Sequence, residues 1–291
     1  MSSIERMVEK LKSSPSTGGG QHKMVERKPA GRTPPVPGDA AKQRKAGFID
    51  IDMNMRKLES VGFIAPPKDR AKLAEEYRRI KRPLLSNAFG KNADAVELGN
   101  VIMVASAMSG EGKTFNTLNL ALSMANEMDI TVLVVDLDVL NPALTRLLGL
   151  DEKLGFTDVL SDPDVTLSDV ILSTNMPKLK VLPAGSRHAQ ANELLASEQM
   201  QRVTHELATR YPDRIVIFDA PPLLMTSEAN VVAGLVGQVL LVVEAGETPQ
   251  SAVKEAVALL DERKVIGIVL NKYKGSDKGQ YGAYYCAYGE E

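Results

Sequence analysis

The sequence predicts an α/β fold, a doubly wound and mostly parallel sheet flanked by helices. Past Asn100, short apolar runs rich in β-branched residues alternate with stretches of helical periodicity. Strands with continuous apolar runs are buried on both faces, which is typical of parallel sheets covered by helices. Strands are expected at 101–105, 131–136, 180–182, 214–219, 239–243 and 265–270. Helices are expected at 69–85, 114–127, 193–210 and 249–263.

Composition divides the chain into three regions. Residues 1–47 are expected to hold a short helix and then a disordered linker, because 13–45 is rich in Gly, Pro, Lys and Arg and has almost no large apolar residue. Such a segment cannot bury enough surface to offset the entropy lost on ordering. Residues 48–278 are expected to form the folded domain, and 279–291 a flexible tail.

The overall composition excludes several classes of protein. A net charge of -2 over 291 residues gives no general attraction to nucleic acid, and none is expected as a partner. A single cysteine, Cys286, excludes a disulfide framework and a cysteine-rich zinc cluster. The first residues lack the apolar segment of a secretory signal, and the most apolar stretch, 231–243, is shorter than the roughly 20 residues of a membrane helix. We therefore expect a cytoplasmic protein that reaches the inner face of the plasma membrane only through a partner.

A phosphate-binding loop is predicted at residues 107–114, which read AMSGEGKT. The loop follows an expected strand and precedes an expected helix, the context that such a loop requires. Glycines let backbone N–H groups turn inward around phosphate, and the start of the helix adds positive potential. Lys113 is expected to reach the β- and γ-phosphates of ATP, and the Thr114 hydroxyl to bind Mg²⁺. The expected ATP-binding residues of the loop are Ser109, Gly110, Glu111, Gly112, Lys113 and Thr114.

Three aspartates stand at the ends of expected strands. Asp136 and Asp138 lie two residues apart, so their side chains point to the same side and can hold Mg²⁺ and accept a proton. Asp219 ends an apolar strand before Ala-Pro-Pro, the pattern of a Walker B carboxylate that orders Mg²⁺ and its waters. Taken alone, the first pair could cap a helix and Asp219 could be a turn residue. Beside a phosphate loop we favour catalysis, with Lys113, Asp136, Asp138 and Asp219 as catalytic candidates and Thr114, Asp136 and Asp219 as Mg²⁺ ligands.

Two weaker signals lie near the end of the chain. Asn271 ends the last expected strand, where an amide is well placed for the base of the nucleotide, although asparagine is also a common turn residue. The tail holds four of the seven tyrosines of the chain, with Tyr273 a weaker fifth candidate acceptor. The tail is either a row of phosphate acceptors or a disordered segment without a role. The candidate acceptors are Tyr281, Tyr284, Tyr285 and Tyr288.

The loop, the double-aspartate strand, the Asp-Ala-Pro-Pro strand and the tyrosine tail, in this order, resemble those of the bacterial tyrosine kinases. These are P-loop autokinases of polysaccharide export, and the resemblance runs from about Ala65 to the end of the chain. The stretch EEYRRIKRPLL at 75–85 looks most similar to the autokinases encoded at exopolysaccharide loci with exosortase and PEP-CTERM proteins. The resemblance implies that Asp138 helps to deprotonate tyrosine, within an acidic set around Mg²⁺.

The same resemblance implies partners. Glu75, Arg78 and Lys81 match the family's Glu-x-x-Arg-x-x-Arg oligomerisation motif, with lysine in the last place. Val139-Leu140-Asn141 stands where the family often has basic residues. A homo-oligomeric ring, a transmembrane chain-length regulator (a Wzz-like polysaccharide co-polymerase) and a cognate tyrosine phosphatase are the implied partners.

The function expected from these observations is ATP-dependent autophosphorylation of the tail tyrosines in trans, which would regulate exopolysaccharide synthesis and export. The alternative is a nucleotide switch without kinase activity, like the MinD/ParA-like ATPases that position cell-division machinery or segregate DNA. Those proteins typically carry a lysine early in the loop, where this chain has Met108, and they need no tyrosine tail. A binding module without catalysis is disfavoured, because Lys113, Thr114 and the three aspartates occur together.

Overall fold

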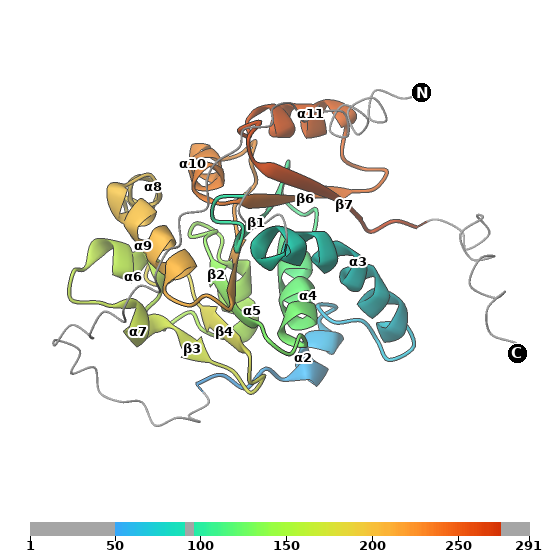
Figure 1. The fold of residues 1–291 in the computed structure, drawn as a ribbon, viewed down its shortest axis with the longest axis horizontal. Helices are drawn as coiled ribbons and strands as arrows, with labels where there is room; N and C mark the ends of the chain where they lie inside the picture. Colours follow the sequence, from blue (N-terminus) through green and yellow to red (C-terminus); the bar gives the residue numbers. More distant parts are fainter. Residues whose placement is uncertain (1–49, 91–95, 275–291) are drawn as a thin grey trace, which may run out of the picture. The chain divides into compact units, whose positions relative to one another are not determined.

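The computed structural model describes residues 50–90 and 96–274, and a seven-stranded sheet lies at its centre (Figure 1). The strand order is β3-β4-β2-β5-β1-β6-β7. Every neighbouring pair is parallel except β3 and β4, which are antiparallel. The strands are β1 (Val101–Ser106), β2 (Thr131–Asp136), β3 (Leu172–Ser173), β4 (Leu179–Leu182), β5 (Arg214–Asp219), β6 (Gln238–Glu244) and β7 (Val265–Asn271).

Helices cover both faces of the sheet, and each face has its own hydrophobic core. One core lies under α2 (Met55–Ser60), α3 (Arg70–Phe89), α4 (Lys113–Ala125) and α5 (Ala143–Leu148). The other lies under α6 (Phe156–Ser161), α7 (Leu167–Val170), α8 (Ala191–Leu195), α9 (Glu198–Thr209), α10 (Ser227–Leu235) and α11 (Gln250–Ala258). Because side chains alternate along a strand, Ile102 enters the first core and Met103 the second. This explains the continuous apolar runs of the inner strands.

The predicted fold class, a mostly parallel sheet with flanking helices, is confirmed. Several details differ from the expectation, including the helix expected at 249–263, which is α11 and ends at Ala258. The helix expected at 193–210 is two helices, α8 and α9, because Ser197 interrupts it and its side chain accepts a hydrogen bond from the N–H of Met200. The helix expected at 69–85 is α3, which contains Pro83 and continues to Phe89. The two-residue strand β3 was missed, since so short a run has no periodicity.

α3 holds α4 near both of its ends. The Tyr77 hydroxyl donates to Asn116 Oδ1 in the first turns of α4, at 3.0 Å. Lys81 is only 7% exposed, and its Nζ donates to the carbonyl of Ser123 at 2.6 Å and pairs with Glu127. An ammonium group at this position satisfies a carbonyl at the negative end of the α4 dipole. The helix that starts at the phosphate loop is therefore fixed against α3.

None of the helices within residues 50–90 and 96–274 combines the length and the apolar character needed to span a membrane.

Tyr77→Phe is expected to lower the free energy of unfolding by about 1–2 kcal/mol, because it leaves a buried acceptor on Asn116 without its donor. Burial, and then the charge of Glu76, raise the pKa of Tyr77, so the hydroxyl remains a donor even at alkaline pH. Urea unfolding monitored by circular dichroism measures the change. Tyr273→Phe is the matched control, since Tyr273 is 77% exposed. Equal stability of the two variants would show that the buried hydrogen bond contributes nothing.

Candidate functional site

The predicted site residues of the sheet come together because parallel strands end at one edge. The phosphate loop follows β1, and Asp219 ends the neighbouring strand β5. Asp136 ends β2 and lies directly opposite Asp219 in the register of the two strands. Asn271 ends β7 at the same edge. Ligands of such sheets bind at the carboxyl ends of the strands.

The loop itself adopts a conformation that requires glycine. Gly110 and Gly112 have φ angles of +86° and +94°, in the left-handed region that other residues rarely adopt. A Cβ atom on Gly112 would also collide with the side-chain amide of Asn271. Gly112 is the N-cap of α4, so the loop runs directly into the start of that helix.

The N–H groups in the middle of the loop are unpaired. Within residues 50–90 and 96–274, the N–H groups of Glu111 and Gly112 donate no hydrogen bond. They lie at the N-terminus of α4, where the helix dipole adds positive potential. Backbone donors without partners at such a position are suited to an anion, and phosphate is the anion that this loop geometry binds in other proteins.

The side chain of Glu111 stabilises the loop through two hydrogen bonds. It is 2% exposed, and its Oε2 accepts a hydrogen bond from the N–H of Met108 at 2.7 Å. Its other oxygen accepts a hydrogen bond from the hydroxyl of Thr248, which follows β6. The carboxylate thus points into the protein, and only the backbone of Glu111 is available to a ligand.

Lys113 and Asp219 are both buried, and the Lys113 charge acts on Asp219. Lys113 is 8% exposed and Asp219 is 1% exposed. Burial raises the pKa of Asp219, while the Thr114 hydroxyl and the Lys113 charge lower it in part. One oxygen accepts from Thr117 at 3.1 Å, but Oδ2 accepts no hydrogen bond of ordinary geometry from the described residues. A buried carboxylate oxygen without a donor fits Mg²⁺ or one of its waters.

Asp136 is fully engaged by its own surroundings. Its Oδ2 accepts from both the N–H and the hydroxyl of Thr145, each at 2.8 Å, and its Oδ1 accepts from the N–H of Asp138 at 3.2 Å. Burial, and then the charge of Asp219, raise the pKa of Asp136. The Asp136 side chain therefore holds the loop after β2 while adding negative charge beside Asp219.

Asp138 lies nearer the surface than the other two aspartates. Its Oδ1 accepts from the N–H of Asn141 at 3.2 Å. Burial raises its pKa, and the Lys113 ammonium lowers it in part. No group of three or more acidic, His or Cys side chains within residues 50–90 and 96–274 forms a complete metal site.

Several predicted residues lie elsewhere. Glu75 and Arg78 form an ion pair on the exposed side of α3, whereas Lys81 points inward to α4. The tail tyrosines at 281, 284, 285 and 288 lie outside the described residues. Lys272 was missed, although it contacts the phosphate loop, because a surface lysine at a strand end has no distinctive sequence signal.

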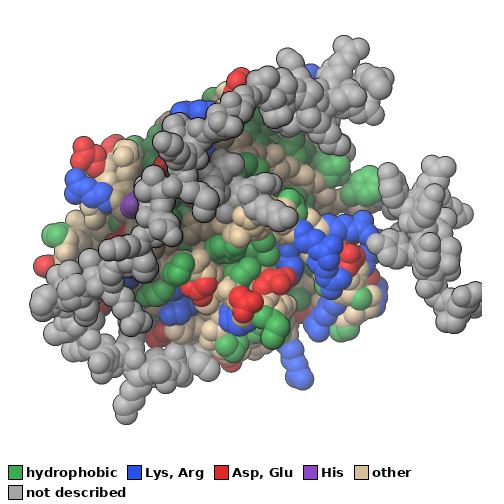
Figure 2. All heavy atoms as spheres, in the orientation of Figure 1, with side chains coloured by type: hydrophobic (Ala, Val, Ile, Leu, Met, Phe, Trp, Pro, Cys, Tyr) green, Lys and Arg blue, Asp and Glu red, His purple; other side chains and the backbone are tan. Residues whose placement is uncertain are grey.

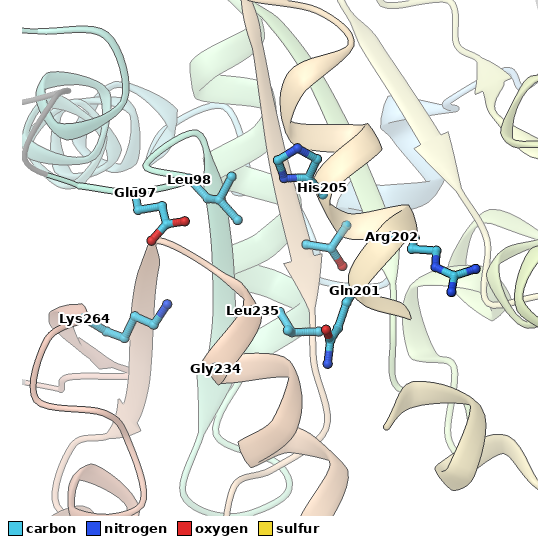
Figure 3. A pocket seen from close by; sticks show the side chains of 9 residues that line it. Glu97, Leu98, Gln201, Arg202, His205, Gly234, Leu235 and Lys264 are labelled. Atoms are coloured by element: carbon cyan, nitrogen blue, oxygen red, sulfur yellow. The ribbon is translucent and has the colours of Figure 1, made fainter. Parts of the chain in front are cut away.

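A hollow of about 550 Å³ lies at the other ends of the strands (Figure 3). None of the predicted site residues lines it. Its polar side chains are those of Glu97, Gln201, Arg202, Thr204, His205 and Lys264. The hollow is therefore separate from the phosphate loop and its acidic residues.

The chain is similar to several known proteins. A family model described as an AAA domain matches residues 99–261. The CapB protein of Staphylococcus aureus is 30% identical over 77% of this chain and 93% of its own length. The tyrosine-protein kinase YwqD of Bacillus subtilis is 29% identical over 76% of this chain and 90% of its own length. The succinoglycan biosynthesis transport protein ExoP of Rhizobium meliloti is 30% identical over 80% of this chain, but only 29% of ExoP is matched.

Two solved structures share the fold. The kinase domain of VpsO is 28% identical, with a TM-score of 0.59 over 72% of this chain and 100% of that domain. The septum site-determining protein MinD of Pyrococcus horikoshii, solved with Mg-ADP, is 27% identical, with a TM-score of 0.51 over 61% of this chain and 72% of its own. Nucleotide and magnesium binding thus occur among proteins with this fold.

Asp219→Asn is expected to stabilise the nucleotide-free protein by about 1–3 kcal/mol at neutral pH, because it removes a buried charge whose pKa the fold raises. The advantage exists above the raised pKa of Asp219 and disappears as the pH falls below the pKa of the unfolded chain. Chemical unfolding at several pH values measures it. Glu228→Gln, on the half-buried start of α10, is the control and should change little. A less stable Asp219→Asn variant would contradict the view that this carboxylate is strained without its cation.

Proposed function

The chain belongs to the bacterial tyrosine-protein kinases with a P-loop, and we propose that it phosphorylates the tail tyrosines of a neighbouring copy of itself. The acceptors in this proposal are Tyr281, Tyr284, Tyr285 and Tyr288. The supporting observation is the meeting of unpaired loop N–H groups, the Lys113 ammonium and three carboxylates at one edge of the sheet. That combination can bind a polyphosphate and receive a proton beside it.

ATP and Mg²⁺ are the proposed ligands, and the residues present fit both. The backbone of residues 109–114 and the Lys113 ammonium would hold the phosphates. Thr114 and Asp219 would hold Mg²⁺. Asp136 would order the loop after β2 and add negative charge beside Asp219. When bound, Mg²⁺ supplies charge neutralisation for the phosphates and for the buried carboxylates.

In the proposed step, the phenolic oxygen of a tail tyrosine forms a bond to the γ-phosphorus of ATP. The bond between that phosphorus and the oxygen that bridges it to the β-phosphate breaks, and ADP leaves. The phenolic proton passes to the carboxylate of Asp138. The raised pKa of Asp138 makes it a stronger base than an exposed aspartate, and its place near the surface leaves it accessible to a second chain. Lys113 balances charge during the transfer.

The rival function is a nucleotide switch without transfer to protein. MinD shares the fold, so the fold alone does not separate the two functions. Met108, which is 47% exposed, stands where such switches typically carry a lysine. The tyrosine-rich tail has no purpose in a switch. Both observations favour the kinase.

A homo-oligomer is proposed because transfer between copies requires that the tail of one reach the loop of another. Figure 2 shows charged side chains of both signs gathered over α3. Glu75 and Arg78 are available for a contact there, while Lys81 is not, since it is buried against α4. The contact proposed for a ring therefore rests on Glu75 and Arg78.

The remaining proposals concern location and partners. We propose that the chain acts in the cytoplasm, where a transmembrane chain-length regulator recruits it to the inner face of the plasma membrane. Its phosphorylation state, reset by a cognate tyrosine phosphatase, would regulate exopolysaccharide synthesis and export. The similarity to ExoP, a succinoglycan transport protein, supports a role in polysaccharide export.

Incubation of the purified protein with ATP and Mg²⁺ is expected to raise its intact mass in steps of one phosphate. Lys113→Met should abolish the gain, because the phosphates lose their main cationic partner. A variant with all four tail tyrosines changed to Phe should hydrolyse ATP at most slowly and gain no phosphate. Steady ATP hydrolysis by the unaltered protein without any mass gain would favour the nucleotide switch.

Phosphorylated protein is expected to form smaller oligomers than dephosphorylated protein, because each phosphotyrosine adds about -1.5 to -2 charge to a tail. Size-exclusion chromatography with light scattering measures the difference. The four-Phe variant, treated with ATP in the same way, is the matched control and should not shift. Identical elution of both forms of the starting protein would refute the effect.

A further inference from the structure

We propose that Asn271 and Lys272, at the carboxyl end of β7, are positioning residues. They bind carbonyl groups of the phosphate loop and thereby orient the N–H groups of the loop toward the phosphate. The inference deepens the proposed nucleotide binding and rests on it. It assigns a new role to Lys272, and it gives Asn271 a role other than contact with the nucleotide base.

Both residues hold carbonyl groups of the loop. Lys272 Nζ donates to the carbonyl oxygen of Gly110 at 2.8 Å. Asn271 Nδ2 donates to the carbonyl oxygen of Glu111, also at 2.8 Å. Two successive peptide groups of the loop are thus fixed by the last residue of β7 and the residue that follows it.

Fixing a carbonyl also fixes the N–H group of the same peptide. Each peptide is planar, and none of the described peptide bonds is cis, so the C=O and N–H of one peptide point in opposite directions. The carbonyl of Gly110 shares its peptide with the N–H of Glu111, and the carbonyl of Glu111 shares its peptide with the N–H of Gly112. Anchoring the two carbonyls toward β7 therefore turns these two N–H groups away from β7, to the side where phosphate would lie.

A third peptide is held in the same way from the helix side. The carbonyl of Gly112 accepts from the backbone N–H of Asn116 at 3.0 Å and from its side-chain Nδ2 at 2.9 Å. The Tyr77 hydroxyl in turn holds the other end of that amide. Three consecutive N–H groups, those of Glu111, Gly112 and Lys113, are oriented before any ligand arrives. Such preorganisation saves the ordering cost at the moment of binding.

The conformation of Lys272 supports a specific role. Its φ angle is +56°, and apart from Leu98 no other non-glycine residue among those described has a positive φ. This region is unfavourable for a lysine, so the surrounding contacts must hold it. Its ammonium is fixed from the far side by Glu244 Oε2 at 2.9 Å. Although its side chain is 45% exposed, a lysine that pairs with a carboxylate and donates to a carbonyl can hold that carbonyl in place.

The location of Asn271 also favours the loop over the base. A Cβ atom on Gly112 would overlap the Asn271 amide, so the amide lies directly against the loop backbone. The same patch of loop is held by Thr248 through the Glu111 carboxylate. The residues at the carboxyl ends of β6 and β7 therefore hold the phosphate loop together, on the side away from the proposed phosphate position.

Calorimetric titration with Mg²⁺-pyrophosphate, Mg²⁺-ADP and Mg²⁺-IDP tests the inference. Pyrophosphate probes the cradle without a base, and ADP against IDP probes recognition of the base. Asn271→Ala and Lys272→Met are each expected to weaken pyrophosphate and ADP binding by a similar factor of about ten, or about 1.4 kcal/mol. The ratio of ADP to IDP affinity should stay unchanged in both variants.

Two further variants control for charge and folding. Lys274→Met removes an equal charge from the same exposed segment, so it should weaken binding much less than Lys272→Met. Lys272→Arg keeps a donor in place and should restore most of the affinity. Amide hydrogen exchange of unliganded Lys272→Met should be faster at Met108, whose N–H is bonded to the Glu111 carboxylate, but unchanged in β2 and β5.

Three results would overturn the inference. A changed ADP to IDP ratio with normal pyrophosphate binding in Asn271→Ala would mean that the amide recognises the base. Equal effects of Lys272→Met and Lys274→Met would mean that Lys272 acts only by its charge. If the unaltered chain bound neither pyrophosphate nor ADP, the proposed nucleotide binding itself would fail, and this inference with it.

Discussion

The orientation of three peptide groups between Gly110 and Lys113 is the constraint on which the rest of the site depends. Glycines at 110 and 112 allow the positive φ angles of the loop. Glycine alone would also allow conformations in which the carbonyl groups, and not the N–H groups, point toward the ligand. The carbonyls are instead held by β7, by the residue after it and by α4. α3 then fixes α4 through Tyr77 and Lys81, so residues distant in the sequence converge on one short loop.

Buried carboxylates of like charge destabilise the site when no ligand is bound, and they also suit it to bind a divalent cation. The Lys113 charge acts on Asp138 and Asp219, and Asp136 and Asp219 are almost completely buried. The burial that raises the pKa of Asp136 and Asp219 is a cost to the empty fold, and a bound divalent cation would offset it. Phosphoryl transfer relies on positioning and on neutralised charge more than on covalent chemistry, and this edge of the sheet offers both.

The fold class and the central site residues could be predicted from sequence because their signals are local. The loop sits between a strand and a helix, and each aspartate ends an apolar run, so a parallel sheet brings them together. The support behind the loop could not be predicted, since the Asn271 and Lys272 contacts depend on how β7 lies two strands away from β1. Lys81 could have been placed better, because Tyr77, Lys81 and Leu84 follow the spacing of one helical face, and all three are buried.

Backbone amide NMR of the loop during titration with Mg²⁺-ADP tests the central claim most directly, because each N–H group reports on its own hydrogen bond. The account predicts that the amide protons of Glu111, Gly112 and Lys113 shift strongly downfield, while that of Met108, already bonded to Glu111, stays nearly unchanged. A spectrum in which Met108 moved and the three other amides did not would show that this loop binds phosphate with a different backbone orientation.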